Sequence, residues 1–154
     1  MANPIQAVNG AVEKLTNWIP TCVIAIMLRL SMFFVFWPSA QTKIIGPSIA
    51  GQKWQFWNLG DNVFLLFAWE YQLPLIPTKF AAYSATLAEF FLALALLFGL
   101  FTRLSAFGLL TITAVIQIFV YPDAWKLHLT WAAILVAIMH YGPGRVSIDS
   151  LMKK

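Results

Sequence analysis

The sequence predicts an all-α membrane protein, an antiparallel four-transmembrane-helix bundle with a long aromatic loop between spans one and two. Hydrophobic residues make up 60% of the chain and charged residues only 10%, whereas soluble domains devote about a quarter of their residues to charged side chains. The apolar residues also gather in four stretches, each close to the roughly 20 residues that cross a bilayer. Residues 1–154 therefore form a single transmembrane domain with no room for a separate soluble catalytic domain.

The apolar stretches set the expected boundaries of the helices. We expect the four spans at about residues 18–37, 80–101, 104–121 and 124–141. The connections between the second, third and fourth spans are only a few residues long, which forces neighbouring helices to run antiparallel. The first stretch lacks a small-residue cleavage site, so we expect a retained span and not a signal peptide.

The connection between the first two spans, residues 38–79, is long and aromatic. Its run 61–71 is rich in Phe, Leu and Trp. Asp61 can cap this run, which then forms a short helix that lies at the membrane surface or folds back onto the bundle. Tryptophans and tyrosines near the span ends are typical of interfacial belts.

The distribution of lysines and arginines indicates an orientation. Five of them lie on the side of the two termini and four on the other side; the five are Lys14, Arg103, Arg145, Lys153 and Lys154. By the positive-inside rule both termini of this multi-pass protein are cytoplasmic and the aromatic loop is extracytoplasmic. These cations form no basic block, so the expected partner is the lipid bilayer and not nucleic acid.

The counts of cysteine and histidine exclude several kinds of site. Cys22 is the only cysteine, which excludes an internal disulfide and a redox-active thiol pair on this chain. His128 and His140 lie twelve positions apart on one helix. Two such residues do not supply the three or four ligands that a metal needs, so we predict no metal site.

Arg29 and Glu89 are charges inside predicted spans. Arg29 lies about 16 Å from the inner end of span one, and Glu89 lies about 18 Å from the inner end of span two. We therefore expect them to pair near the midplane, because an unpaired charge there costs at least about 2.5 kcal/mol. The pair is either part of a functional site or a structural clamp that fixes helix register.

Three further polar residues lie toward the outer half of the predicted bundle. Lys43 follows span one, Gln117 lies near the end of span three and His128 lies one turn into span four. If they face inward, they line a polar pocket with Arg29 and Glu89, where a quinone head group or a small polar ligand would dock. His128 could relay protons there, or it could lie at the interface and hydrogen-bond a neighbour.

Three segments carry a resemblance to a known family. They are Arg29 with Lys43 fourteen residues later, the segment 89–104, and the exit from span four at residues 142–149. In their order and spacing the sequence resembles the DoxX family. Arg29, Lys43, Glu89 and Arg103 match the polar marks of that family. Gly142, Pro143 and Gly144 match its structural motif at the helix exit, although Gly-Pro-Gly is also a general helix stop.

The resemblance carries expectations about location and role. It implies a four-helix protein of the cell inner (cytoplasmic) membrane. Some members of the family are linked to thiosulfate oxidation with quinone as acceptor, and others to oxidative or thiol-stress complexes at the membrane. The long aromatic loop resembles the branch that is encoded beside metal-stress peptide-modification systems.

These observations lead to one main functional hypothesis and two alternatives. The first is a membrane subunit of a redox or stress-response system that binds quinone or another small amphiphile around Arg29 and Glu89. It would work with a partner protein or as a homo-oligomer, and as an oxidoreductase subunit it would need a bound cofactor, because the chain shows no redox centre of its own. The alternatives are a noncatalytic scaffold that holds a partner through the aromatic loop, and a small-solute carrier, although the sequence shows no inverted repeat.

Overall fold

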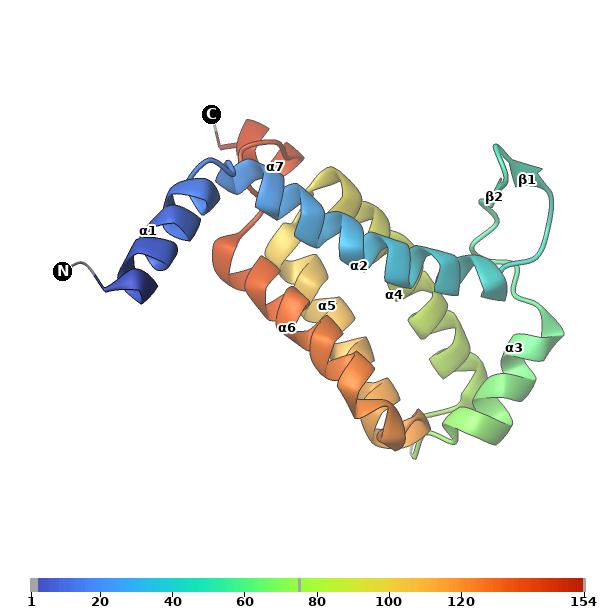
Figure 1. The fold of residues 1–154 in the computed structure, drawn as a ribbon. Helices are drawn as coiled ribbons and strands as arrows, with labels where there is room; N and C mark the ends of the chain where they lie inside the picture. The colour runs from blue at the N-terminus through green and yellow to red at the C-terminus, as the bar shows by residue number, and fades with distance from the viewer. Residues whose placement is uncertain (1–2, 75, 154) are drawn as a thin grey trace.

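Four long helices pack into an antiparallel bundle in the computed structural model, which describes residues 3–74 and 76–153 (Figure 1). Lys154, one of the predicted inner cations, lies outside these residues. The four helices are α2 (Thr21–Lys43), α4 (Thr78–Phe98), α5 (Thr102–Val115) and α6 (Trp125–Tyr141). Helices α2 and α5 each pack against both α4 and α6, so every helix of the bundle has two neighbours.

The protein has helices suited to a membrane. Among the residues that the structure describes, three segments are long and apolar enough to cross one: Thr21–Lys43, Thr78–Phe98 and Thr102–Val120, which is α5 with its π-helical extension η2 (Ile116–Val120). Large apolar side chains such as Met27, Phe34 and Phe107 are exposed on the outside of these helices. Such surfaces suit a lipid environment, because apolar side chains that contact lipid are also shielded from water.

The interior of the bundle is apolar, with small residues where helices approach closely. Met32, Phe36 and Leu135 are among the fully buried side chains. Gly108 allows α5 to approach α4, because a Cβ atom at this position would lie 2.5 Å from Leu92 Cδ1. Small residues at such contacts are typical of membrane helix packing.

Helix α2 extends further than the sequence predicted. It was expected to end at residue 37, but it continues to Lys43 with Pro38 inside it. Proline removes one backbone hydrogen bond, which usually ends or kinks a helix, but membrane helices tolerate it when neighbours compensate. Lys43 therefore belongs to the last turn of α2, and the prediction that it follows the span is wrong.

The long connection after α2 contains a short β-hairpin and a helix. The strands are β1 (Ser48–Ile49) and β2 (Gln52–Lys53), and the helix is α3 (Asp61–Leu66), which continues as the π-helical turn η1 (Phe67–Tyr71). The N-cap residue of α3 is Gly60, and Asp61 lies in the first turn of the helix. The prediction that Asp61 caps this helix is therefore wrong. Val63, Phe67 and Tyr71 pack with Ala81 and Ala82 of α4, so this segment folds back onto the bundle.

Two short helices complete the fold. Helix α1 (Pro4–Thr16) projects away from the bundle, and α7 (Ile148–Leu151) lies at the same end (Figure 1). Helix α1 was not predicted from the sequence, because it is too short to span a membrane. Its signal was the spacing of Ile5, Val8 and Val12 along one helical face. We call the end with α7 and the α4–α5 turn the terminal end, and the end with α3 and η1 the loop end.

Candidate functional site

Arg29 and Glu89 do not pair, which corrects the prediction. The Arg29 guanidinium donates a hydrogen bond of 3.0 Å to the Leu97 carbonyl. Leu97 lies eight residues after Glu89 in α4, or about 12 Å along the helix. The first turns of α2 extend past α4 at the terminal end, where Ala25 meets Gly144. Equal residue counts from the two helix ends therefore do not correspond to equal depths.

Arg29 instead binds backbone carbonyls at the terminal end. Its Nη1 donates to the carbonyls of Pro143 and Val146, each at 2.8 Å, in addition to the Nη2 bond to Leu97. The guanidinium is buried, and its Nε has no partner among the described residues. Gly99 makes room for it, since a Cβ atom there would lie 2.7 Å from Nη1. Arg29 thus fastens the chain after α6 to the end of α4.

Asp149 fastens the same C-terminal segment to α5. Its carboxylate accepts hydrogen bonds from the backbone N–H groups of Phe101 (2.7 Å) and Thr102 (2.8 Å), and from the Thr102 hydroxyl (2.8 Å). These N–H groups belong to a helix start that lacks a local cap. Burial opposes the charge on Asp149, but the hydrogen bonds from Thr102 and Phe101 outweigh it and hold the pKa of this carboxyl below its ordinary value.

The predicted structural motif lies in this region. Gly142 and Gly144 have positive φ angles of 79° and 77°, which favour glycine. A Cβ atom on Gly144 would also lie only 2.7 Å from Ala25 Cβ, and one on Gly142 would lie 3.4 Å from Arg103 Nη2. Arg103 itself is exposed. Gly142, Pro143 and Gly144 thus lie where the C-terminal segment packs against Arg103, Arg29 and Ala25.

Glu89 pairs with Lys43. The Lys43 ammonium lies 2.6 Å from Glu89 Oε2, and the two side chains are 7% and 2% exposed. The same ammonium also donates to the hydroxyl of Ser39 (2.8 Å) and to its carbonyl (3.3 Å). Three acceptors thus account for the three N–H bonds of the lysine. The ion pair joins α2 to α4 inside the bundle.

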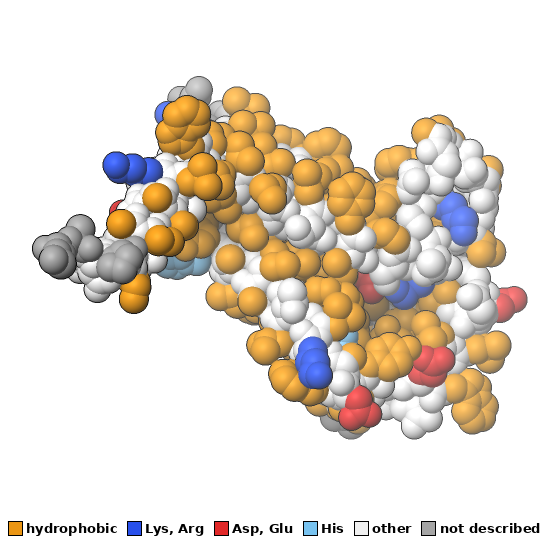
Figure 2. Space-filling view, in the orientation of Figure 1, with side chains coloured by type: hydrophobic (Ala, Val, Ile, Leu, Met, Phe, Trp, Pro, Cys, Tyr) orange, Lys and Arg blue, Asp and Glu red, His pale blue; other side chains and the backbone are white. Residues whose placement is uncertain are grey.

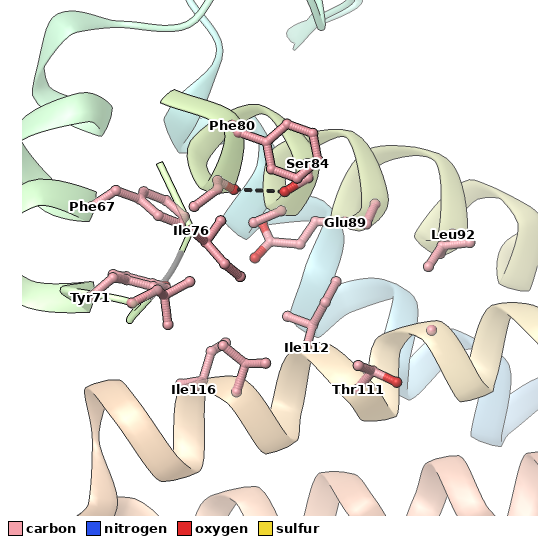
Figure 3. Close-up of a pocket in the computed structure, with 16 residues that line it drawn as sticks. Phe67, Tyr71, Ile76, Phe80, Ser84, Glu89, Leu92, Thr111, Ile112 and Ile116 are labelled. Carbon is pink, nitrogen blue, oxygen red and sulfur yellow. Dashed lines mark hydrogen bonds between the residues drawn. The ribbon is translucent and has the colours of Figure 1, made fainter. Parts of the chain in front are cut away.

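An apolar cavity of 360 Å³ ends at Glu89. Figure 3 shows the Glu89 side chain extending from α4 into this space, with Tyr71 of η1 and Ile112 and Ile116 around it. Exposed residues of α4 and α5, such as Ser84 and Thr111, also line the cavity, so it opens on the outer surface of the bundle. We call it the lateral cavity.

A second cavity, of 260 Å³, lies between α2, α6 and the loop end of the bundle. The lining residues whose side chains carry a hydrogen-bonding group are Ser39, Tyr71, Glu89, Tyr121, His128 and Trp131. Figure 2 shows this face hollowed between α2 and α6, with acidic and basic side chains inside the hollow. We call it the interhelical cavity. It shares Glu89, Tyr71 and Ile116 with the lateral cavity, so the Glu89 carboxylate stands between an apolar compartment and a more polar one.

His128 is oriented by Gln117. The Gln117 amide donates from Nε2 to the Pro122 carbonyl at 2.7 Å, which directs its oxygen Oε1 toward His128 Nδ1, also at 2.7 Å. An amide oxygen only accepts, so Nδ1 carries the proton in this arrangement and Nε2 of the neutral ring is an acceptor. Gln117 lines a separate cavity of 320 Å³ together with His128. Gln117 therefore contacts His128 from the side of this separate cavity and does not lie beside Glu89.

Two tyrosines at the loop end complete the interhelical cavity. The Tyr121 hydroxyl donates to Glu70 Oε2 at 2.9 Å, and this hydrogen bond raises the pKa of Tyr121. Burial, together with the nearby carboxylate of Glu89, raises the pKa of Tyr71. Both hydroxyls therefore stay protonated at neutral pH. The Tyr71 hydroxyl makes no hydrogen bond to any residue that the structure describes.

Sequence reasoning missed Ser39, Tyr71 and Tyr121 as parts of the site. Ser39 lies four residues before Lys43, a spacing that places both on one helical face once α2 is known to continue through Pro38. Tyr71 reaches the site because η1 folds back against η2, and both segments are π-helical. Single π-turns are frequent at functional sites. No pattern in the sequence indicated this contact.

The predicted ligand-binding residues therefore divide into two groups. Glu89 and His128 face the interhelical cavity, Lys43 holds Glu89, and Gln117 orients His128, whereas Arg29 lies at the terminal end. Within residues 3–74 and 76–153, no three His, Cys, Asp or Glu side chains converge as a metal would require. The arrangement suits a small molecule with an apolar part and a polar head.

Comparisons with known proteins identify the family of this chain. The family model DoxX matches residues 24–122, which include Arg29, Lys43 and Glu89. An uncharacterized protein of Haemophilus influenzae is 26% identical over 139 residues, which cover 84% of this chain and 85% of that protein. No solved structure matches significantly. The match to the family model spans more than half of the chain, and we conclude that the protein belongs to the DoxX family.

Proposed function

We propose that this protein is a four-span protein of the inner membrane that binds quinone or a similar small amphiphile at Glu89. One observation carries the proposal: a buried, ion-paired carboxylate stands where an apolar cavity meets one with several polar side chains. An amphiphile needs both environments next to each other. Its tail fits the lateral cavity, and its head fits the interhelical cavity.

The lateral cavity has the size and lining of a small-molecule site. Its volume of 360 Å³ falls within the range of about 300 to 1,000 Å³ that is usual for ligand pockets. Its lining is mainly apolar, and the Ser84 and Thr111 hydroxyls are already bonded to carbonyls of their own helices. Because it opens on the outer surface of α4 and α5, a ligand dissolved in the bilayer can enter from the side.

The proposal includes a fourth span and an orientation. Helix α6 has 17 residues, or about 26 Å, which approaches the roughly 30 Å thickness of the hydrocarbon core. Exposed Trp125 and Tyr141 lie at its two ends, as interfacial anchors do. Four spans bring both termini to one side, and the balance of cations favours the cytoplasm for them.

The protein would act as the membrane subunit of a redox or stress-response system. It would bind and orient the ligand and accept protons at Glu89 or His128, while a partner protein exchanges the electrons. The resemblance of the sequence to DoxX proteins linked to quinone and thiol chemistry supports this role. The protein would thus serve the chemistry of a complex without a redox centre of its own.

Binding of a quinone analogue to the purified protein tests the proposal. We expect decyl-ubiquinone to bind to the protein in lipid nanodiscs, and Ala85→Phe, which fills the lateral cavity, to weaken binding at least tenfold. Ala133→Phe is the matched control, since Ala133 is an exposed residue on α6. Binding would be read by native mass spectrometry and tryptophan fluorescence. A wild-type protein that neither carries nor binds quinone would overturn the proposal.

A scaffold function remains a second candidate because of the exposed aromatic residues of the loop. Trp57 and Trp69 are 60% and 75% exposed, and exposed tryptophans are frequent anchors in protein interfaces. Loss of a copurifying partner after Trp57→Ser and Trp69→Ser, with quinone binding unchanged, would favour this function. Unchanged copurification would count against it.

A further inference from the structure

We propose that the interhelical cavity selects amphiphiles whose head group donates hydrogen bonds, such as a hydroquinone or another phenol, over acceptor-only heads such as the oxidised quinone. The inference rests on the proposed function, because it specifies which form of the ligand the Glu89 site prefers. It follows from the hydrogen-bonding role of each polar group that lines the cavity.

Glu89 presents an acceptor. A carboxylate can only accept hydrogen bonds, and Lys43 occupies Oε2 at 2.6 Å, which leaves Oε1 for a ligand. Lys43 does not offer a competing donor, because its three N–H bonds are directed to Glu89 and to the hydroxyl and carbonyl of Ser39. The ion pair therefore stabilises the charged, accepting form of Glu89 and keeps the ammonium occupied.

His128 presents a second acceptor. The bond from Gln117 Nε2 to the Pro122 carbonyl fixes the amide, and the amide oxygen then requires the proton on His128 Nδ1. The other tautomer would place two acceptors 2.7 Å apart, which is unfavourable. Nε2 makes no hydrogen bond within the described part of the chain, although the side chain is only 4% exposed. An unpaired acceptor of this kind favours a ligand that brings a proton.

The other polar groups of the cavity do not reverse this preference. The Ser39 and Tyr71 hydroxyls can each donate or accept. The Tyr121 hydroxyl already donates to Glu70. Among the described side chains that line the cavity, the Trp131 indole N–H is the donor-only group, whereas Glu89 and His128 present two acceptors. A head group with two donors satisfies both, whereas an acceptor-only head leaves both unpaired.

The size of the cavity fits an aromatic head group. A cavity of about 150 Å³ holds benzene in a protein interior, so 260 Å³ is large enough for one ring with substituents. The Phe36 and Leu127 side chains and the indole ring of Trp131 complete its walls and suit the faces of such a ring. The lateral cavity meets it at Glu89 and can receive the chain attached to the ring.

The test compares ligands of one skeleton on the full chain in nanodiscs. The probes are decyl-ubiquinol, decyl-ubiquinone and an analogue in which methyl groups replace the two ring hydroxyls. We expect the quinol to bind at least about tenfold more tightly than either of the others, since each buried acceptor left unpaired costs enough for such a factor. For the bound two-electron couple this preference raises the midpoint potential by about 30 mV per tenfold.

Variants show whether the named acceptors cause the preference. We expect His128→Phe to reduce the ratio of quinone to quinol dissociation constants several-fold, and Thr130→Ala, an exposed position on α6, to leave it unchanged. Equal binding of quinol, quinone and the methyl analogue to the wild-type protein would overturn this inference while leaving the proposed function intact. If none of the three binds, the proposed function fails as well. The wild-type comparison decides the matter even if His128→Phe does not fold.

Discussion

The Lys43 and Glu89 side chains each depend on the other inside the bundle. Both are nearly inaccessible, and their charged groups are 2.6 Å apart. Removal of one partner from a buried pair costs about 3 to 5 kcal/mol, mainly because the other charge is left unpaired. Replacement of both by apolar residues of similar volume often restores stability.

We therefore expect Lys43→Met and Glu89→Leu each to lower the free energy of unfolding by about 3 to 5 kcal/mol, and the double variant to recover most of the loss. Unfolding in detergent, followed by circular dichroism, measures the effect. Lys126→Met is the control for a lysine of the exposed surface. A double variant as unstable as the sum of the single variants would contradict the pairing.

At the scale of single elements, hydrophobic runs predicted the helices well and their ends less well. Helix α4 was expected at 80–101 and lies at Thr78–Phe98, where Gly99 adopts the left-handed conformation that ends it. The end of α2 was misplaced by six residues, because Pro38 looks like a helix stop in sequence but stays inside the helix. Because of this error, Lys43 was placed outside the helix and was not predicted as the partner of Glu89.

The sequence could not predict how far the helices are shifted along one another in the bundle. The depth of a residue in a bundle depends on how far each helix slides along its neighbours, and the helix start at Thr21 extends past the end of α4. Counting residues within each helix carries no information on this offset. It placed Arg29 beside Glu89, whereas the bond to the Leu97 carbonyl and the approach of Gly99 put Arg29 near the α4–α5 turn.

Asp149 makes the start of α5 sensitive to acid. The pKa of this carboxyl is lower in the folded protein than its ordinary value, because hydrogen bonds from Thr102 and Phe101 outweigh the effect of burial. A group with a depressed pKa stabilises the fold above the ordinary pKa of about 3.9, and this stabilisation is lost as pH falls through the folded value. The contribution is therefore fully present at neutral pH, begins to fall near pH 4 and is lost as pH drops through the lower pKa of the folded protein.

We expect Asp149→Asn to cost about 0.5 to 2 kcal/mol at pH 7, as loss of a helix cap does. The difference from wild type should shrink in acid, as the wild-type carboxyl becomes protonated. Thermal unfolding between pH 7 and pH 3 measures both effects. Asp123→Asn, at the turn before α6, is the control. A difference that stays constant over this pH range would show that the charge of Asp149 contributes nothing.

At the scale of the whole molecule, the bundle has two ends with different features. The terminal end is tied together by Arg29 and Asp149 through bonds to backbone groups. The loop end contains the two π-helical turns, the interhelical cavity and the ion pair. The fold thus combines an end held by bonds to backbone groups with an end that contains the proposed Glu89 site, and the proposed orientation directs that site toward the outside of the cell membrane.

Labelling of single cysteines in intact cells tests this orientation and the number of spans together. In a Cys22→Ser background, we expect Trp57→Cys to react with a membrane-impermeant maleimide from the outside, because Trp57 is exposed in the loop between α2 and α4. Lys153→Cys, after α7, should react only after the cells are opened. With an even number of spans, Ala2→Cys, which precedes α1 in the sequence, should likewise react only after the cells are opened. Labelling of positions 2 and 153 from opposite sides would mean that α6 does not cross the membrane. Labelling of both from the outside would reverse the orientation, and with it the side of the membrane on which the Glu89 site lies.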